Sequence, residues 1–354
     1  MAYTAIDDPS AYFHTQLYTG DGASTNAITN DANAGDFQPD WIWIKRRDGA
    51  DNHHVFDTSR GITKELNTNG TGAEGSGTNL VKSSDTDGFT LGDNGGVNGS
   101  SETYVAWQWK ANGGTTTTND ASSTGVGSLD SVYQANTTAG FSIITYTGTG
   151  SNATIAHGLG SAPTMLIVKN RSSAESWMVG HHKNSNGFQS SVFLDLTAAK
   201  DTDAVYFNNT APTSTVISIG TNTKINHASE NHVMYAFAEI QGYSKFGSYT
   251  GNGNVDGPFV YTGFSPAWVM VKRFDSGNNW HLHDSKRVPY NSNNKTLYPN
   301  LDNVEQTEDF DMLSNGFKLR ESGGGYNASG GTYIYMAFAE SPFVSSEGVP
   351  TTAR

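Results

Sequence analysis

A short pattern occurs three times in this chain: a proline, a spacer residue, four apolar residues and a lysine. The three copies are Pro39–Lys45, Pro163–Lys169 and Pro266–Lys272. Four consecutive apolar residues, largely β-branched or aromatic, are typical of a strand that is apolar on both faces. Proline suits the first position of such a strand because no ladder hydrogen bond is lost there. The pattern therefore predicts one buried strand in each of three copies of a structural unit.

The flanking sequence repeats as well. A Tyr-Thr-Gly-x-Gly element precedes each strand, at Tyr18–Gly22, Tyr146–Gly150 and Tyr249–Gly253. A matched aromatic strand with a shared alanine follows each, at Tyr104–Trp109, Met234–Glu239 and Tyr335–Glu340. The repeat thus indicates three units of about a hundred residues, each large enough to hold its own core.

The composition indicates which kind of unit this is. The chain has 40 glycines and only 16% charged residues, a balance that favours short strands joined by tight turns over helices. We therefore predict an all-β fold of three tandem β-sandwich, jelly-roll-like modules of about 100 residues. The predicted boundaries are a leader over 1–16, modules over 17–112, 140–242 and 243–344, a Thr/Ser/Gly-rich linker over 113–139, and a flexible tail over 345–354.

Three connecting segments predict how the modules are arranged. The low-complexity linker is long enough to let the first module sit apart from the other two. The connection Gln241–Gly247 is short and carries two aromatic residues, so we expect the second and third modules to pack together. The glycine-rich segment Asn67–Gly77 is too polar to pack and is predicted to be a mobile loop.

Charge and composition exclude several partners and chemistries. The formal net charge is −13 and there is no cysteine, so we expect no nucleic-acid partner, disulfide or thiolate chemistry. The first twenty residues show no signal-peptide pattern, and no run of apolar residues is long enough to span a membrane. We therefore expect neither export by a Sec signal nor membrane insertion.

Aromatic and histidine side chains near the repeated strands are the main binding candidates. Trp41 and Trp43 project to one side of their strand, yet an isolated sandwich needs only one apolar face per strand. Another segment of the module, a neighbouring module or another copy of the chain must cover the second face. We name six residues as candidate contacts for a receptor or partner: Trp41, Trp43, Trp177, Trp280, His281 and His283. Core packing is the simpler interpretation of the tryptophans, and sugar stacking is the alternative for Trp177 and Trp280.

No metal or catalytic site is predicted. Histidine pairs such as His281 and His283 lack a third ligand nearby. Asp21, Asp93 and Asp256 lie among Gly and Asn but lack full calcium-loop spacing, so no cofactor is predicted and Ca²⁺ stays an alternative. The carboxylates of Glu308, Asp309 and Asp311 could serve a glycosidase, but the repeat does not mark them.

Two Asp-x-x-Arg pairs follow the repeated strands of the first and third copies. They are Asp57 with Arg60, and Asp284 with Arg287. Such a pair at a strand end closes a turn through a hydrogen bond and an ion pair, and contributes about 1 kcal/mol at a surface. No nucleophile pattern surrounds either pair, so we interpret both as structural turn pairs.

Longer phrases of the chain resemble a known group of proteins. They are Asp7–Phe13, Gln38–Lys45, Tyr104–Lys110, Tyr243–Gly253 and Tyr333–Glu340. These phrases resemble repeat-bearing structural proteins of marine tailed bacteriophages, commonly labelled tail fibre or virion proteins. The resemblance covers nearly the whole chain and implies a virion component without implying any catalytic residue.

The expected function is accordingly that of a phage structural protein, in a tail fibre or associated with one, that takes part in attachment to the host receptor. Its expected partners are other virion proteins, further copies of itself (a trimer if it is a fibre), and a host-surface glycan or protein. The expected location is the virion, assembled in the host cytoplasm. The alternatives are a capsid decoration or fibre-base protein, a glycan depolymerase, and a secreted bacterial adhesin, which the missing export signal disfavours.

Overall fold

The computed structural model describes residues 3–31, 37–184 and 187–351 of the chain. Nearly all of its regular structure is β, in several antiparallel sheets, which confirms the predicted all-β class. The described helices are single turns: η1 (Pro9–Ala11), α1 (Gly95–Asn98), α2 (Ala121–Thr124), η2 (Gly187–Gln189) and α3 (Thr223–Asn226). None of them is long and apolar enough to cross a membrane.

Three large sheets form the centre of the molecule, and we call them the first, second and third sheets. The first has the strand order β1 (Phe13–Thr19), β9 (Thr103–Trp109), β3 (Trp41–Arg46), β4 (His53–Asp57), β5 (Lys64–Asn67), β6 (Gly75–Ser76). The second has the order β10 (Thr117–Asn119), β11 (Ser131–Asn136), β12 (Phe141–Thr147), β18 (Asn231–Phe237), β14 (Met165–Asn170), β15 (Met178–His181), β16 (Ser191–Phe193). The third has the order β19 (Ser244–Thr250), β26 (Thr332–Pro342), β21 (Phe264–Arg273), β22 (Trp280–Asp284).

The proline-headed sequences occupy corresponding places in the three sheets. Each forms the strand (β3, β14 or β21) between the late aromatic strand of its copy (β9, β18 or β26) and the histidine- or tryptophan-bearing strand that follows it (β4, β15 or β22). All of these pairings are antiparallel. The division of the chain into three separable modules stays a prediction, because the sheets also share an interior.

A smaller sheet lies against the outer side of each large sheet. The outer sheet beside the first has the order β2 (Asn26–Ile28), β8 (Gly88–Leu91), β7 (Val81–Asp85). Beside the second lie β13 (Ala153–Ala156) and β17 (Val216–Ile219). Beside the third lies the order β20 (Phe259–Tyr261), β25 (Gly316–Leu319), β24 (Gln306–Leu313), β23 (Asn293–Thr296).

Alternation along each repeated strand divides its side chains between two cores. In β3, Ile42 and Ile44 pack with the outer sheet in a core made only of the first copy, whereas Trp41 and Trp43 face the opposite way. The same division holds for β14 and β21, whose even- and odd-numbered residues enter different clusters. The outer side of each repeated strand therefore closes a sandwich, and the inner side needs cover from elsewhere.

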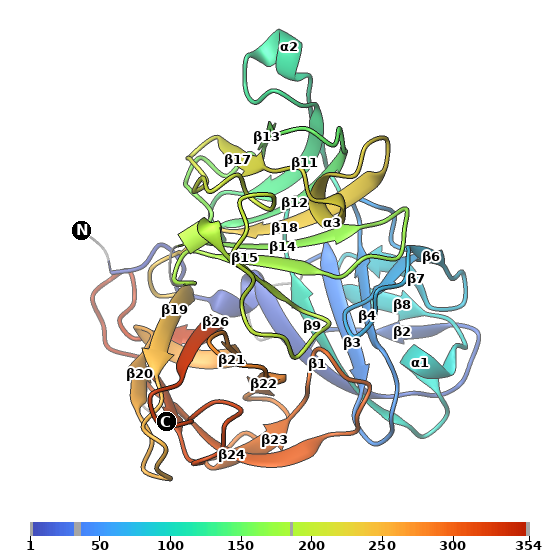
Figure 1. The fold of residues 1–354 in the computed structure, drawn as a ribbon. Helices are drawn as coiled ribbons and strands as arrows, with labels where there is room; N and C mark the ends of the chain where they lie inside the picture. Colours follow the sequence, from blue (N-terminus) through green and yellow to red (C-terminus); the bar gives the residue numbers. More distant parts are fainter. Residues whose placement is uncertain (1–2, 32–36, 185–186, 352–354) are drawn as a thin grey trace.

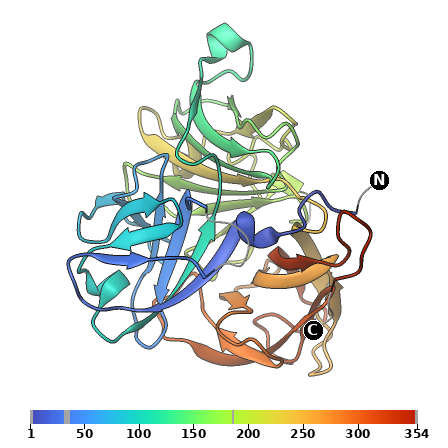
Figure 2. The same cartoon turned by 180° about the vertical axis from the view of Figure 1, so that it is seen from behind.

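That cover comes from the other two sheets of the same chain. Figures 1 and 2 show the blue, green-to-yellow and orange-to-red strands grouped around a common centre. There the Trp41 ring lies 4.3 Å from the Trp109 ring and 4.5 Å from the Tyr235 ring of the second sheet. Trp109 in turn lies 5.7 Å from Trp268 of the third sheet. One cluster of buried residues from all three sheets fills this centre, and we call it the shared core.

Several predicted boundaries need correction. Leader residues Phe13–Gln16 belong to β1. The predicted linker 113–139 contains α2 and the strands β10 and β11, and the two strands extend the second sheet. The first copy does not sit apart, because its aromatic face closes the shared core. The segment 345–351 of the predicted flexible tail folds back, with Thr351 N donating to Phe343 O and Ser346 N donating to Asp7. Residues 352–354 lie outside the described residues.

Candidate functional site

The six candidate contact residues all lie inside the protein. Trp41, Trp43, Trp177 and Trp280 belong to the shared core, and His281 and His283 are also buried. Their prediction as receptor or partner contacts is therefore corrected, because the apolar face that was expected to need an external partner is covered by the neighbouring sheets. The argument from exposed aromatic faces to self-association loses its basis for the same reason.

Two of these tryptophans join one sheet to a strand of another by a hydrogen bond. Trp177 Nε1 donates to the Asn67 carbonyl of the first sheet at 2.8 Å, and Trp280 Nε1 donates to the Phe193 carbonyl of the second sheet at 2.8 Å. A buried indole N–H usually has such an acceptor. The same residues that could have stacked on a sugar at a surface are thus occupied in holding the sheets together.

The buried histidines have protein partners. His281 Nδ1 lies 2.7 Å from a Glu308 oxygen, and His283 stacks on Phe310 with ring centroids 4.3 Å apart. Burial lowers the pKa of His283 well below its usual value. Across residues 3–31, 37–184 and 187–351, no three His, Asp or Glu side chains are grouped as metal ligands.

The Asp-x-x-Arg pairs are buried and do not lie at the surface as expected. Asp57 Oδ1 accepts a hydrogen bond from Arg60 N at 2.7 Å, which closes the turn, and both side chains are fully buried. The Asp57 carboxylate also accepts from the Tyr235 hydroxyl of the second sheet at 2.7 Å. Because a buried ion pair is held by further hydrogen bonds, its loss costs more than that of a surface pair.

The second pair repeats this arrangement at another junction. Arg287 N donates to Asp284 Oδ1 at 2.9 Å, and the Asp284 carboxylate accepts from Trp107 Nε1 of the first sheet at 3.0 Å. The Arg287 guanidinium lies 5.8 Å from the Trp107 ring centroid. Each pair therefore closes a turn of its own copy and binds a neighbouring sheet.

The three repeated lysines are buried and donate to carbonyl groups. Lys169 Nζ donates to Thr71 O of the first sheet's loop at 2.9 Å, and Lys272 Nζ donates to Thr197 O of the second copy at 2.9 Å. Burial lowers the pKa of Lys169 to about 8 and that of Lys272 to about 7. A lysine of lowered pKa can be a nucleophile, but these two ammonium groups are directed at backbone oxygens between sheets, so their role is structural.

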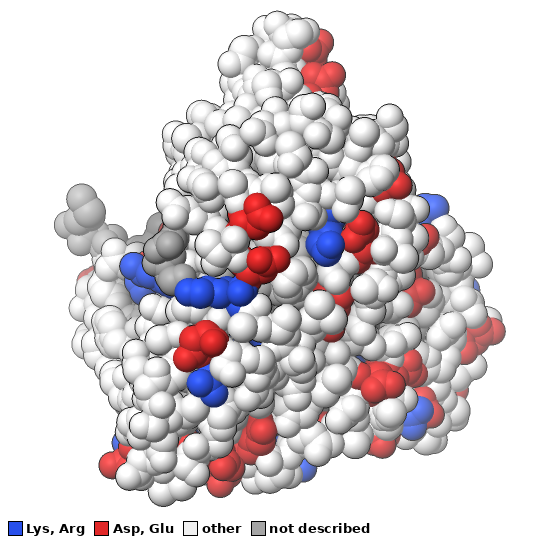
Figure 3. Space-filling model, in the orientation of Figure 1, with Lys and Arg blue, Asp and Glu red and all other residues white. Residues whose placement is uncertain are grey.

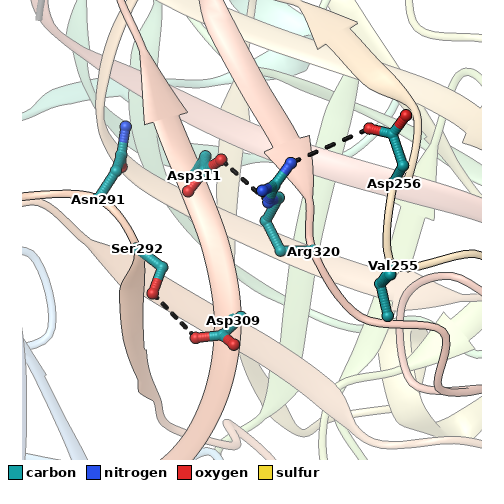
Figure 4. Close-up of a pocket in the computed structure, with 7 residues that line it drawn as sticks. All are labelled: Val255, Asp256, Asn291, Ser292, Asp309, Asp311 and Arg320. Carbon is teal, nitrogen blue, oxygen red and sulfur yellow. Dashed lines mark hydrogen bonds and ion pairs between the residues drawn. The ribbon is translucent and has the colours of Figure 1, made fainter.

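A hollow on the surface lies on the outer sheet of the third copy. It is a groove of about 590 Å³ lined by Val255, Asp256, Asn291, Ser292, Asp309, Asp311 and Arg320. Figure 4 shows Asp309, Asp311 and Arg320 between the Asn291–Ser292 segment on one side and the Val255–Asp256 segment on the other. Smaller hollows of about 330 and 240 Å³ lie near Tyr3 and Thr118.

Strand alternation places the charged groups of this groove on its floor. In β24, Phe310 and Met312 enter the core of the third copy, so Asp309 and Asp311 point outward. Arg320 follows β25 and pairs with Asp311 at 3.3 Å. Ser292 Oγ donates to Asp309 Oδ1 at 2.9 Å. The floor is thus a row of carboxylates and one guanidinium held on a rigid sheet.

The two walls are fixed by different contacts. Asn291 exchanges hydrogen bonds with the backbone of Met312, at 2.7 Å and 2.9 Å, and so anchors its wall to β24. On the other wall Asp256 pairs with Lys318 at 2.5 Å, and this contact lowers the pKa of Asp256. Cationic groups beside Asp256 oppose a metal ion there. Asp21, the calcium candidate of the first copy, accepts hydrogen bonds from protein groups, from Ala23 N at 2.8 Å and from Asn98 Nδ2 at 3.0 Å.

Sequence reasoning found single members of the groove without bringing them together. Asp256 was considered for calcium, and Asp309 and Asp311 for acid–base chemistry, but Arg320, Asn291 and Ser292 were missed. A usable signal was the alternation of polar and apolar residues over Asp309–Met312 and Phe317–Arg320, which predicts an outward polar face. The loops that form the walls carry no such pattern.

The fold and the groove define an all-β protein of stacked sheets with a polar surface groove and a common aromatic interior. A family model described as a domain of unknown function, DUF7483, matches residues 8–342. The chain belongs to this family, and the matched residues include all three large sheets. No curated protein matches the chain.

Proposed function

We propose that this protein is a structural component of a bacteriophage virion, in or beside a tail fibre, and that it takes part in attachment to the host. One observation carries the proposal. The repeated tryptophans and Asp-Arg pairs are used to build the interior, while a polar groove remains open on one rigid outer sheet. Such an arrangement suits a protein that binds a partner at its surface, because the buried contacts between the sheets hold the groove in place.

The surface and the sequence support the same role. Figure 3 shows a face on which charged side chains are few and scattered among uncharged ones, as the low charged fraction of 16% requires. Adhesive surfaces such as antibody paratopes are rich in tyrosine and small polar residues. The resemblance of five phrases to structural proteins of marine tailed phages adds the virion location to the proposal.

The test is labelling of intact phage particles that carry this chain. Gold-labelled antibody against the purified protein should mark the tail or its fibres in electron micrographs. Label on the capsid would favour the alternative, a head decoration protein. Particles without label would contradict a virion role. Release of reducing sugar from host polysaccharide by the pure protein would instead favour a depolymerase.

A further inference from the structure

The outer sheet of the third copy differs from its two counterparts in what it presents to solvent. Three large aromatic side chains are exposed in the described part of the chain: Phe259 at 46%, Tyr261 at 53% and Tyr290 at 81%. Phe259 and Tyr261 flank the buried Val260 on β20, so they share its outward face. Tyr290 directly precedes Asn291, which lines the groove. Exposed aromatic rings gathered on one face are typical of a binding surface.

The registers extend this face across three strands. Phe259 lies opposite Lys318, and Lys318 lies opposite Asp311. Arg320 N donates to Asp309 O at 3.3 Å, one row further along. Aromatic, cationic and acidic groups therefore lie in adjacent rows of one sheet. The first copy has Thr90 where the third has Lys318, so a cationic group at this position is not part of the repeated sequence pattern.

The groups in the groove retain capacity for a ligand. Asp311 uses one carboxylate oxygen for Arg320, and Asp309 uses one for Ser292. Among the described residues, the other carboxylate oxygens, Asp309 Oδ2 and Asp311 Oδ1, make no hydrogen bond or ion pair. Carboxylates accept charge-assisted hydrogen bonds from hydroxyl groups, and a guanidinium donates to ring or carbonyl oxygens. This combination matches a ligand that carries many hydroxyl groups.

We propose that this groove binds a neutral glycan, with Asp309, Asp311 and Arg320 bonding its hydroxyl groups and Tyr290 stacking on a sugar ring. The proposal rests on the attachment role, because it names the surface that would contact the host. Three carboxylates, those of Asp256, Asp309 and Asp311, outnumber the two cationic groups beside them, Arg320 and Lys318, which disfavours a sulfated or uronic-acid chain because like charges repel. Val255 is the one apolar lining residue, so the groove lacks the apolar pocket that anchors a protein partner.

The test is a glycan array that carries neutral hexose and N-acetylhexosamine oligosaccharides beside sulfated and sialylated ones, probed with the whole chain. We expect binding to at least one neutral glycan. Asp311→Asn and Tyr290→Ala should each weaken that binding by about tenfold or more, as the loss of a charge-assisted hydrogen bond or a stacking face predicts. Asp93→Asn removes an exposed carboxylate on the first copy and should leave binding unchanged.

Each other outcome would overturn the assignment. Binding to no neutral glycan, or to anionic glycans alone, would contradict the ligand class. Binding that survives both groove variants would contradict the site. These failures are separable from that of the proposed function, because labelling of virions does not depend on the array: label on the tail with a silent array would retain the virion role and remove only the glycan.

Discussion

At the scale of single residues, the protein buries charged side chains, although burial of a charge costs free energy. Asp57 and Arg60 are both fully buried, and the Asp57 carboxylate also holds the Tyr235 hydroxyl. Arg60 reaches Glu74 at 3.0 Å and the Val55 carbonyl at 3.2 Å. Removing one partner would leave the other charge buried without its counter-charge, and this strongly destabilises the folded protein.

We therefore expect Asp57→Asn to lower the free energy of unfolding by about 3 kcal/mol or more. The measurement is equilibrium unfolding in urea at neutral pH, followed by tryptophan fluorescence. Asp93→Asn, which changes an exposed carboxylate, is the matched control and should stay within about 0.5 kcal/mol of the parent. A loss for Asp57→Asn as small as that of the control would show that the pair contributes no more than a surface pair.

His181 provides a pH-dependent contact between the second and third sheets. Its Nε2 donates to Tyr335 O at 3.2 Å, and its Nδ1 accepts from Lys183 N at 3.1 Å. The bond accepted at Nδ1 needs the neutral ring, and burial lowers the pKa of His181 to about 3. As the pH falls, His181 is therefore protonated in the unfolded chain before it is protonated in the folded protein. The stabilisation is complete above pH 6.5 and is lost as the pH falls from 6.5 towards 3.

His181→Gln should reduce the slope of the free energy of unfolding against pH, below pH 6.5, by about 1.4 kcal/mol per pH unit. Unfolding curves between pH 7 and pH 5 would measure the slope. His227→Gln, a change at a half-exposed histidine of the second copy, is the control for the loss of a histidine. If His181→Gln kept the parent slope, protonation of His181 would not be coupled to unfolding.

At the scale of elements, the glycine-rich segment after β5 shows how composition can mislead. Its glycines and polar residues predicted a mobile loop, but Glu74 pairs with Arg171 of the second sheet at 2.8 Å and with Arg60 of its own sheet. Thr71 O accepts from Lys169. Long-range partners hold a segment that has no apolar side chain to bury, and a local pattern cannot reveal partners a hundred residues away.

Arg171→Gln should release this segment while leaving the Arg60–Glu74 contact in place. We expect faster limited proteolysis between residues 67 and 77, with peptide masses locating the cuts. Arg273→Gln removes a local ion pair with Asp275 on the third sheet and should leave the cleavage rate in 67–77 unchanged. Equal cleavage of both variants and the parent would mean that Arg171 does not hold the segment.

The strand pattern itself was predictable, and the strand partners in space were not. Alternation in Trp41–Ile44 shows that both faces are apolar, and the repeat places two more such strands, so the all-β class follows from sequence. The same pattern allowed three kinds of cover for the tryptophan face. The choice depends on how the sheets pack, which involves contacts between residues far apart in the chain. The groove was hidden for the same reason, since its walls come from separate loops.

At the scale of the whole molecule, the three sheets share one interior and so depend on each other. The rings of Trp41, Trp109, Tyr235 and Trp268 meet at the centre and come from all three sheets. Further contacts join loops of the third copy to loops of the first, including Arg47 to Glu305 at 2.7 Å and Thr68 Oγ1 to Pro299 O at 2.8 Å. Unfolding one sheet would expose the inner face of the other two.

Differential scanning calorimetry of the intact chain tests this dependence most directly. A shared core predicts a single transition whose van't Hoff enthalpy equals the calorimetric enthalpy, because no sheet is stable once another has opened. Two or three resolved transitions, or a calorimetric enthalpy two to three times the van't Hoff value, would show that the copies unfold separately and would contradict the account.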